Sequence, residues 1–350
     1  MIKVEIDLNA LKANLRYIKA KAGVPVLAVV KADAYGHGLV RCAQAAIEAG
    51  ADYLGTATLS EAFALREAGI KAPLLAWLLP PGEDFKRAVQ LNIELGLSSL
   101  SAFDEVNAIP GAKIHLEVES GMGRGGFSNE WPELLNRDLS KVFGIFTHLA
   151  RADEPSEAQN KTQLENFEIF VNDLKARGVN PIRHLSNTAA TLSNPDAKYD
   201  MVRVGIAMYG LSPLGRDENL KPVMKIKAKL VLVKDLPKGH PIGYGASEVT
   251  KSDTKIGIVG MGYADGIPRN AKGAGVTFMG QTAPIIGRVS MDQFAVDLGA
   301  ESSAKSGDWV TVIGEKFDAY DWAQACQTIH YEITTRISQR VPRFYLEDKE

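Results

Sequence analysis

The sequence has few cysteines. Cys42 and Cys326 are the two in 350 residues, and neither lies in a CxxC motif or beside a cluster of histidines. This spacing argues against a metal cluster or a disulfide scaffold, and it is typical of proteins from a reducing compartment. We therefore expect no metal site and a cytoplasmic location.

The sequence also lacks an excess of charge of either sign and any long apolar run. It carries 40 Lys and Arg against 42 Asp and Glu, a formal net charge of -2. We find neither a basic stripe for nucleic acid nor a cationic helix for a membrane surface. The apolar runs are too short to span a membrane, and Glu5 and Asp7 stand where a signal peptide is apolar. A small-molecule partner is therefore favoured.

Short apolar runs, separated by segments with helical spacing, fill the chain up to about residue 210. Near-continuously apolar strands that alternate with helices are typical of a (β/α)8 TIM-like barrel, whose strands are buried on both faces. The runs are Val26–Lys31, Tyr53–Thr56, Leu74–Leu79, Ile93–Leu97, Ile114–Val118, Val142–Thr147, Arg183–Ser186 and Met201–Val204.

The pattern changes after a charged segment rich in proline and glycine, Leu211–Val223. Beyond it, runs such as Lys225–Leu230 alternate polar with apolar residues, as in an antiparallel sheet with one wet face. We therefore predict an α/β protein in which a barrel, residues 10–215, is followed by a mainly antiparallel β domain, residues 216–350. Residues 1–9 also alternate and are interpreted as an N-terminal strand that can join the β domain.

Lys31 is the first candidate for chemistry because it ends the first apolar run and precedes a glycine-containing loop. A lysine at the mouth of a buried strand can lose its proton by desolvation, and an uncharged amine attacks an aldehyde to form a Schiff base. In a barrel, function gathers at the carboxyl ends of the strands. Arg124, His148, Asn187, Thr188, Arg203 and Gly205 lie at or just beyond the ends of later runs and are predicted to converge on the same mouth.

The loops after the last two runs are predicted to bind a phosphate group, because barrels commonly place such a site there. Thr188 offers a hydroxyl and Gly205 permits a close approach of the backbone. Taken alone, each residue is equally compatible with a plain helix cap or a plain turn.

The segment Val29–Gly38 resembles the lysine motif of the alanine racemases, and matching motifs continue almost to the C-terminus. The resemblance implies a pyridoxal 5'-phosphate (PLP) enzyme that interconverts L- and D-alanine for peptidoglycan synthesis. It also implies a homodimer in which Lys31 of one subunit and Tyr244 of the other act as the two bases. The implied cofactor contacts are Lys31, Tyr35, Arg124, His148, Asn187, Thr188, Arg203, Gly205 and Ile206.

By the same resemblance, Arg203 faces the pyridine nitrogen of the cofactor and joins a hydrogen-bond network with His148 and His184. A guanidinium group only donates, and its pKa is too high for it to pass a proton to that nitrogen. The ring then stays a weak electron sink, which favours racemisation over transamination. Arg124 and Met291 would bind the substrate carboxylate. Asp153, Tyr263, Arg269, Arg288 and Asp292 would support the site or line its entrance.

Three positions depart from the pattern of the relatives. Glu117 stands where most have a lysine carbamate that orients the arginine equivalent to Arg124, so a permanent carboxylate is expected to replace a reversible one; an ordinary strand glutamate is the alternative. Gln339 replaces a tyrosine and Arg151 replaces a smaller residue. Together they predict L-alanine as the best substrate with detectable turnover of serine, unless Gln339 only fills space beside the phosphate.

Three other functions use the same lysine. They are a racemase of broader specificity, a PLP-dependent lyase or decarboxylase, and a non-catalytic PLP carrier, which would need Lys31 but no second base. The presence of Tyr244 in its motif and of a β domain favours a racemase.

Overall fold

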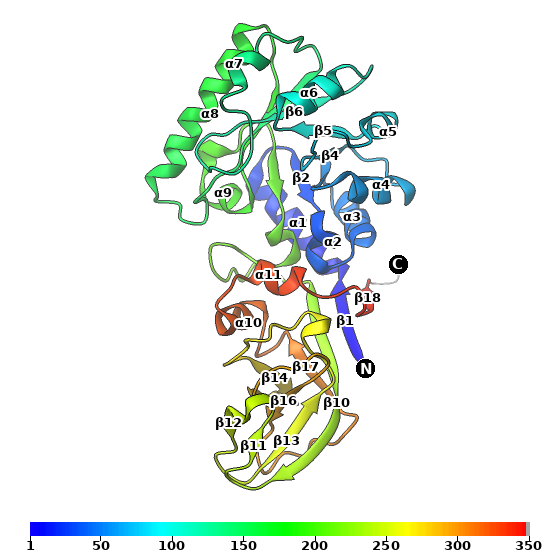
Figure 1. Cartoon of the computed structure of the whole chain (residues 1–350), viewed down its shortest axis with the longest axis vertical. Coiled ribbons are helices and arrows are strands. Elements are labelled where there is room, and N and C mark those ends of the chain that lie inside the picture. The colour runs from blue at the N-terminus through cyan, green and yellow to red at the C-terminus, as the bar shows by residue number, and fades with distance from the viewer. Residues whose placement is uncertain (348–350) are drawn as a thin grey trace. The chain divides into compact units, whose positions relative to one another are not determined.

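The computed structural model describes residues 1–347, and the chain divides into two compact units (Figure 1). The barrel unit consists of Ala10–Ala34 and Leu39–Lys221. The β unit consists of Met1–Asn9, Tyr35–Gly38 and the residues from Pro222 onward.

Eight parallel strands form the sheet of the barrel unit, in the order β8-β7-β6-β5-β4-β3-β2-β9. Two hydrogen bonds connect β8 and β9, the strands at the two ends of this order, through residues within or beside them: the Asp200 N–H donates to Arg183 O (3.1 Å) and the Arg203 N–H donates to Ser186 O (2.8 Å). The sheet is therefore a closed ring, and the predicted (β/α)8 fold is confirmed. Its strands are β2 (Val26–Val29), β3 (Tyr53–Thr56), β4 (Leu74–Ala76), β5 (Glu94–Leu97), β6 (Ile114–Glu117), β7 (Val142–Phe146), β8 (Ile182–His184) and β9 (Val202–Val204).

Helices lie outside this ring of strands (Figure 1). Several begin at a side-chain cap; in α4, for example, Thr58 and Glu61 form a reciprocal capping box. Such caps satisfy N–H groups that have no partner within the helix. The helices are α1 (Leu8–Ala22), α3 (Leu39–Glu48), α4 (Leu59–Glu67), α5 (Phe85–Gln90), α6 (Leu100–Asn107), α7 (Trp131–Leu134), α8 (Ala158–Ala176) and α9 (Thr188–Ser193).

A second ring of strands makes up most of the β unit. β13, β16, β15, β14, β17 and β10 pair in succession, and β10 pairs back with β13 beyond an irregularity between Leu230 and Leu232. β1 (Ile2–Asp7) pairs antiparallel with β10 and parallel with β18 (Arg343–Leu346). The ring strands are β10 (Met224–Leu236), β13 (Thr254–Val259), β14 (Gly275–Phe278), β15 (Gln281–Ile286), β16 (Phe294–Asp297) and β17 (Trp309–Ile313). The predicted, mainly antiparallel second part is confirmed.

Two short helices and a hairpin complete the β unit. The helices α10 (Ala319–Cys326) and α11 (His330–Thr335) are separated at Gln327, whose φ of 56° ends α10 in a left-handed cap. The hairpin pairs β11 (Pro241–Ile242) with β12 (Glu248–Val249).

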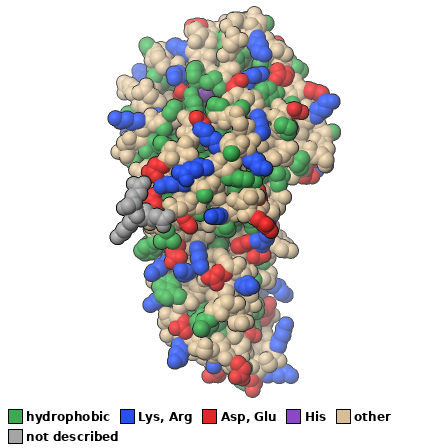
Figure 2. All heavy atoms as spheres, turned by 180° about the vertical axis from the view of Figure 1, so that it is seen from behind, with side chains coloured by type: hydrophobic (Ala, Val, Ile, Leu, Met, Phe, Trp, Pro, Cys, Tyr) green, Lys and Arg blue, Asp and Glu red, His purple; other side chains and the backbone are tan. Residues whose placement is uncertain are grey.

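The surface agrees with the near-neutral charge of the sequence. Basic and acidic side chains are mixed over the face shown in Figure 2. Within residues 1–347, no helix combines the length and the apolar character needed to cross a membrane.

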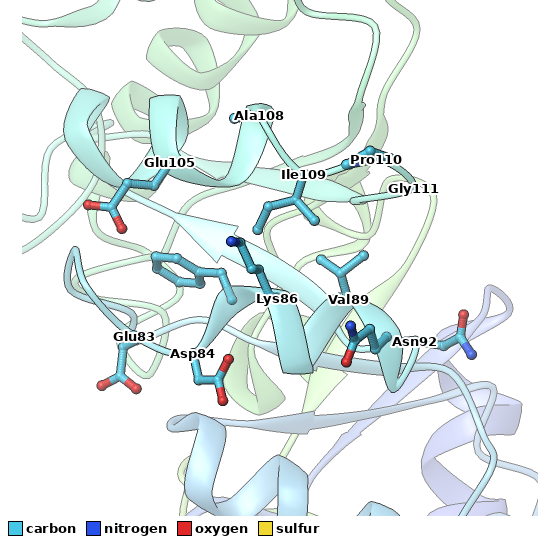
Figure 3. Close-up of a pocket in the computed structure, with 12 residues that line it drawn as sticks. Glu83, Asp84, Lys86, Val89, Asn92, Glu105, Ala108, Ile109, Pro110 and Gly111 are labelled. Carbon is cyan, nitrogen blue, oxygen red and sulfur yellow. The ribbon is translucent and has the colours of Figure 1, made fainter.

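A groove of about 880 Å³ lies on the barrel unit between α5 and α6 (Figure 3). Phe85, Val89 and Ile109 supply apolar surface, and Glu83 and Glu105 supply charge at its margin. No predicted site residue lines this groove, so it is distinct from the predicted site.

Candidate active site

Lys31 follows the end of β2 after one intervening residue and opens α2 (Lys31–Gly36), a turn of left-handed helix. Ala32, Asp33, Ala34 and Tyr35 have φ values of 54, 54, 53 and 54°. Left-handed helix costs roughly 1–2 kcal/mol per residue for L-amino acids, so the surroundings must hold the turn in place. This strained turn fixes Lys31 at the carboxyl end of its strand.

Two carboxylates hold the ends of the turn. Glu61 accepts from the Ala32 N–H at 2.6 Å, and Asp33 accepts from the Leu39 N–H at 2.8 Å. Glu61 is also the third helical residue in the capping box of α4, so the helix after β3 supports the loop after β2. The side-chain position of Lys31 is therefore supported by a neighbouring βα unit.

The surroundings of Lys31 favour its uncharged form. Desolvation is the main cause that lowers its pKa, and the positive charges of Arg124 and Arg203 act in the same direction against Glu61. An amine with a lowered pKa is a better nucleophile and base near neutrality. The geometry thus supports the chemistry predicted for this lysine.

Arg203 lies in β9 with its guanidinium buried in the barrel. Nη1 donates to His184 O and faces His184 Nδ1 at 3.3 Å, while Nη2 donates to Thr147 O (2.8 Å) and faces His148 Nδ1 at 3.3 Å. Both terminal nitrogens of Arg203, Nη1 and Nη2, therefore have acceptors. Among residues 1–347, Nε of Arg203 makes no hydrogen bond, so its N–H is a donor available to a bound group.

Both histidines beside Arg203 are neutral acceptors. Burial lowers the pKa of His184 far below its usual value, and desolvation with the charges of Arg203, Arg124 and Lys31 lowers the pKa of His148 to about 3. A neutral imidazole offers one bare nitrogen, which suits a guanidinium that only donates. The predicted network of Arg203, His148 and His184 is present in the structure.

The loops after β8 and β9 are joined at Thr188. Its hydroxyl accepts from the Gly205 N–H at 3.0 Å, and the Asn187 side chain caps α9 by accepting from the Ala190 N–H at 3.0 Å. Ile206 opens the short 3-10 helix Ile206–Tyr209. Four of the predicted cofactor contacts, Asn187, Thr188, Gly205 and Ile206, thus lie at two helix starts, where N–H groups point outward.

Glu117 ends β6 in a half-buried position near the arginines. Desolvation raises its pKa, while the positive charges of Arg203 and Arg124 oppose this rise. A Cβ added to Gly125 would lie 3.6 Å from both carboxylate oxygens, so the loop that carries exposed Arg124 runs against Glu117. Glu117 therefore lies beside the loop of Arg124 and within electrostatic reach of Arg203.

Glu119 is a residue that the sequence analysis missed. Its carboxylate accepts from four consecutive backbone N–H groups, those of Gly121 (2.5 Å), Met122 (2.6 Å), Gly123 (2.8 Å) and Arg124 (3.1 Å). Although desolvation opposes it, these bonds lower the pKa of Glu119. The glycine-rich segment that follows Glu119 in the sequence was the signal for this contact, because successive backbone N–H groups form an anion-binding nest.

Arg151 follows β7 and pairs with local acids. Its guanidinium contacts Glu154 and, at 2.9 Å, Glu157, and nearby Asp153 is exposed. These ion pairs direct the charge of Arg151 toward the glutamates in its own loop.

In the β unit, Tyr244 stands on a turn that needs glycine. It opens the 3-10 helix Tyr244–Ala246 between β11 and β12, and Gly243 and Gly245 on either side have φ values of 66 and 75°. A Cβ on Gly245 would meet Arg288 Nη1 at 3.3 Å, so Arg288 packs beside this turn. Tyr244 itself is 68% exposed in the single chain.

Tyr263 and Met291 lie on two loops that are hydrogen-bonded to each other. The Tyr263 N–H donates to Ser290 O (3.0 Å) and the Ala264 N–H to Met291 O (2.9 Å). Arg340 then bridges Asp265 and Asp292 at 2.7 and 2.6 Å. Arg340 is a further residue that the sequence analysis missed, and its neighbour Gln339 is exposed, as is Arg269.

Two family models match consecutive parts of the chain. The alanine racemase N-terminal domain matches residues 6–213, and the alanine racemase C-terminal domain matches residues 223–345. The chain belongs to the alanine racemase family. The predicted family is therefore confirmed.

Individual alanine racemases resemble the chain over almost its whole length. The alanine racemase of Streptomyces coelicolor is 42% identical over 376 aligned positions, which cover 99% of this chain and 96% of the relative. The crystal structure of the alanine racemase from Streptomyces lavendulae superposes with a TM-score of 0.96 at 43% identity, covering 99% of this chain and 97% of the other. The alanine racemase of Bartonella henselae, with covalently bound pyridoxal phosphate, has a TM-score of 0.91 at 28% identity and covers 99% of each chain.

Proposed function

We propose that Lys31 and Tyr244 are the two bases of an alanine racemase, one on each face of the substrate Cα. Family membership confirms the predicted isomerase activity on L- and D-alanine and the predicted cofactor, pyridoxal phosphate. It does not favour the alternatives of a broader racemase, a lyase or a carrier. The observation that carries the assignment of Lys31 is its desolvated amine at the end of β2, beside Arg203.

Pyridoxal phosphate supplies an electron-withdrawing ring that makes the Cα–H of bound alanine acidic. Residues 10–215 would bind this cofactor and residues 216–350 would supply Tyr244. Lys31 is suited to accept the Cα proton on one face because its pKa is lowered. The phenol of Tyr244 would return a proton on the other face, since inversion needs one base on each side.

The remaining residues hold the reactants in place. The arrangement of Asn187, Thr188, Gly205 and Ile206 suits a phosphate group, to which Tyr35 would add its hydroxyl. The Nε–H of Arg203 would face the ring nitrogen without passing it a proton. Arg124 and Met291 would bind the substrate carboxylate; Asp153, Tyr263, Arg269, Arg288 and Asp292 would line or support the entrance.

The exposed position of Tyr244 supports a homodimer with shared sites. A catalytic tyrosine that is 68% exposed in one chain is available to a partner subunit. We propose that the active enzyme is such a dimer, acts in the cytoplasm and supplies D-alanine for peptidoglycan.

The function is tested by incubating the PLP-loaded protein with L-alanine or D-alanine in deuterium oxide. We expect each enantiomer to be converted into the other, with solvent deuterium entering Cα mainly in the newly formed enantiomer. Two bases predict this labelling, because the proton is taken on one face and a solvent-derived deuteron is returned on the other. Equal early labelling of recovered substrate and product would contradict the two-base assignment, and failure to form the opposite enantiomer would contradict the function.

Glu117 predicts that activity is independent of dissolved carbon dioxide. Its carboxylate is permanent, whereas a lysine carbamate forms reversibly from bicarbonate. We expect equal initial rates in degassed buffer with and without added bicarbonate. The matched comparison is Glu117→Lys, in which bicarbonate should raise the rate. A bicarbonate requirement of the native enzyme would show that Glu117 does not play this part.

A further inference from the structure

Two buried polar residues in the barrel have no part in the site as described so far. Glu94, the first residue of β5, is 5% exposed, and His115 on β6 is 0% exposed. Burying such groups is costly unless they are hydrogen-bonded. Their contacts lead across the barrel to Arg203.

The contacts form an unbroken chain. Glu94 Oε2 lies 2.9 Å from His115 Nε2, and His115 Nδ1 lies 2.9 Å from His184 Nε2. His184 Nδ1 in turn faces Arg203 Nη1 at 3.3 Å. Glu94 on β5, His115 on β6, His184 on β8 and Arg203 on β9 are thus linked, each to the next, by side-chain contacts.

The strand between the two histidines is shaped to let them meet. Gly144 on β7 is paired with His115, and a Cβ at this position would lie 2.1 Å from His115 Nδ1. Any side chain here would displace the ring from His184. Phe146, two residues further along β7, stacks on the His184 ring with an interplanar angle of 15°. Both imidazoles are therefore held in one orientation.

The donors and acceptors allow only one direction of donation along this series of hydrogen bonds. An arginine only donates, so His184 Nδ1 must be bare and its proton must lie on Nε2. That N–H donates to His115 Nδ1, which must be bare in turn, so His115 carries its proton on Nε2. The His115 N–H then donates to the Glu94 carboxylate, which only accepts.

An ionised Glu94 is the acceptor that the last hydrogen bond of this series requires. Lys113 Nζ lies 3.2 Å from Glu94 Oε1. Burial alone would raise the pKa of Glu94, but the hydrogen bond and electrostatic attraction of His115, followed by the charge of Lys113, outweigh it and lower the pKa. The carboxylate of Glu94 and the guanidinium of Arg203 are thus linked through the two imidazole rings.

We propose that Glu94 and His115 are positioning residues that set the tautomer of His184 and thereby the orientation of Arg203. The inference rests on the proposed role of Arg203 at the cofactor ring. If His115 were lost, His184 could move its proton to Nδ1, where it would oppose the Arg203 N–H. Arg203 would then shift, and its Nε–H would no longer be aimed reliably at the ring nitrogen.

Histidine tautomers in the cofactor-free protein give a direct test. Nitrogen-15 NMR of histidine-labelled protein distinguishes Nε2–H from Nδ1–H rings, and His115→Phe and His184→Phe variants assign the signals. We expect both His115 and His184 to be neutral and protonated at Nε2 near pH 7. A proton on Nδ1 of either ring, or a doubly protonated ring, overturns the inference whatever the activity of the enzyme.

Kinetics of His115→Phe and Glu94→Gln test the consequence for Arg203. Losing a hydrogen bond in a chain that ends in charged groups predicts a fall in kcat by about tenfold to a hundredfold in His115→Phe. KM for alanine should change little, because the proposed carboxylate contacts are elsewhere. The amount of pyruvate, the product of transamination, formed per racemisation event should rise. A mispositioned Arg203 would let the ring nitrogen gain a proton, which favours transamination.

The matched variants make each outcome decisive. Glu94→Gln removes the charge but keeps an acceptor for His115, so the tautomers should persist and kcat should fall less. Asp104→Asn, which neutralises an acid of the exposed pair with Arg137, should behave as the native enzyme. If His115→Phe only lowers the melting temperature and leaves kcat, the pyruvate ratio and the His184 tautomer unchanged, the two residues are structural. A native enzyme that forms no D-alanine refutes the proposed function, whereas opposite tautomers in an active enzyme refute only this inference.

Discussion

Replacing Lys31 with alanine is expected to lower D-alanine formation by about 10⁴-fold or more, as for other residues that act directly on the reacting atoms. The substitution removes both the amine that would hold the cofactor and one of the two bases. A racemase assay on PLP-saturated protein measures this loss. The visible absorbance that arises from covalently bound cofactor should disappear at the same time.

Two controls separate this effect from general damage. Lys161→Ala removes a lysine that is 83% exposed and paired with Glu165, and it should leave the activity unchanged. Borohydride reduction of the native holoenzyme, followed by peptide mapping, should place the cofactor on Lys31. A label on a different lysine would show that the assignment is wrong.

Replacing Tyr244 with phenylalanine should also cost several orders of magnitude in rate, because the substitution keeps the ring and removes only the hydroxyl. If Tyr244 acts in the partner's site, mixing inactive Lys31→Ala and Tyr244→Phe proteins should restore activity. Half of the randomly paired dimers are hybrids with one native site out of two, so about a quarter of the native activity is expected.

The mixing experiment requires that subunits exchange, which differently tagged chains can verify by co-purification. Tyr17→Phe, which removes a hydroxyl 3.5 Å from Asp217, serves as the matched control and should retain activity. Absence of rescue despite demonstrated exchange would argue that each site is built from a single chain.

The strands of the barrel could be predicted because their signal is local. A parallel strand covered by helices is buried on both faces, so its sequence is a nearly continuous run of apolar residues. β2, β3 and β5 to β9 lie within one or two residues of the predicted runs, while the run at Leu74–Leu79 continues past the end of β4 at Ala76. The positions of Lys31, Thr188 and Arg203 at strand ends followed from the same pattern.

The backbone after β2 could not be predicted in this way. Ala32–Tyr35 contains no glycine, yet all four residues are left-handed, because Glu61 and the Asp33 carboxylate hold the turn from outside its own backbone. Local propensity favours right-handed φ for such residues. The conformation that presents Lys31 therefore depends in part on the contact from Glu61 in the neighbouring βα unit, which local propensity does not reveal.

The sequence by itself determined the family, the barrel with its following β domain, and the chemical types of the residues at the strand ends. The tertiary structure alone decided which of these side chains meet. Glu94 is indistinguishable from an ordinary strand residue in its run, and its connection to Arg203 depends on strand order, on register and on the absence of a side chain at Gly144. Periodicity reports which face of an element is buried, whereas hydrogen bonds across several strands depend on how those elements are placed side by side.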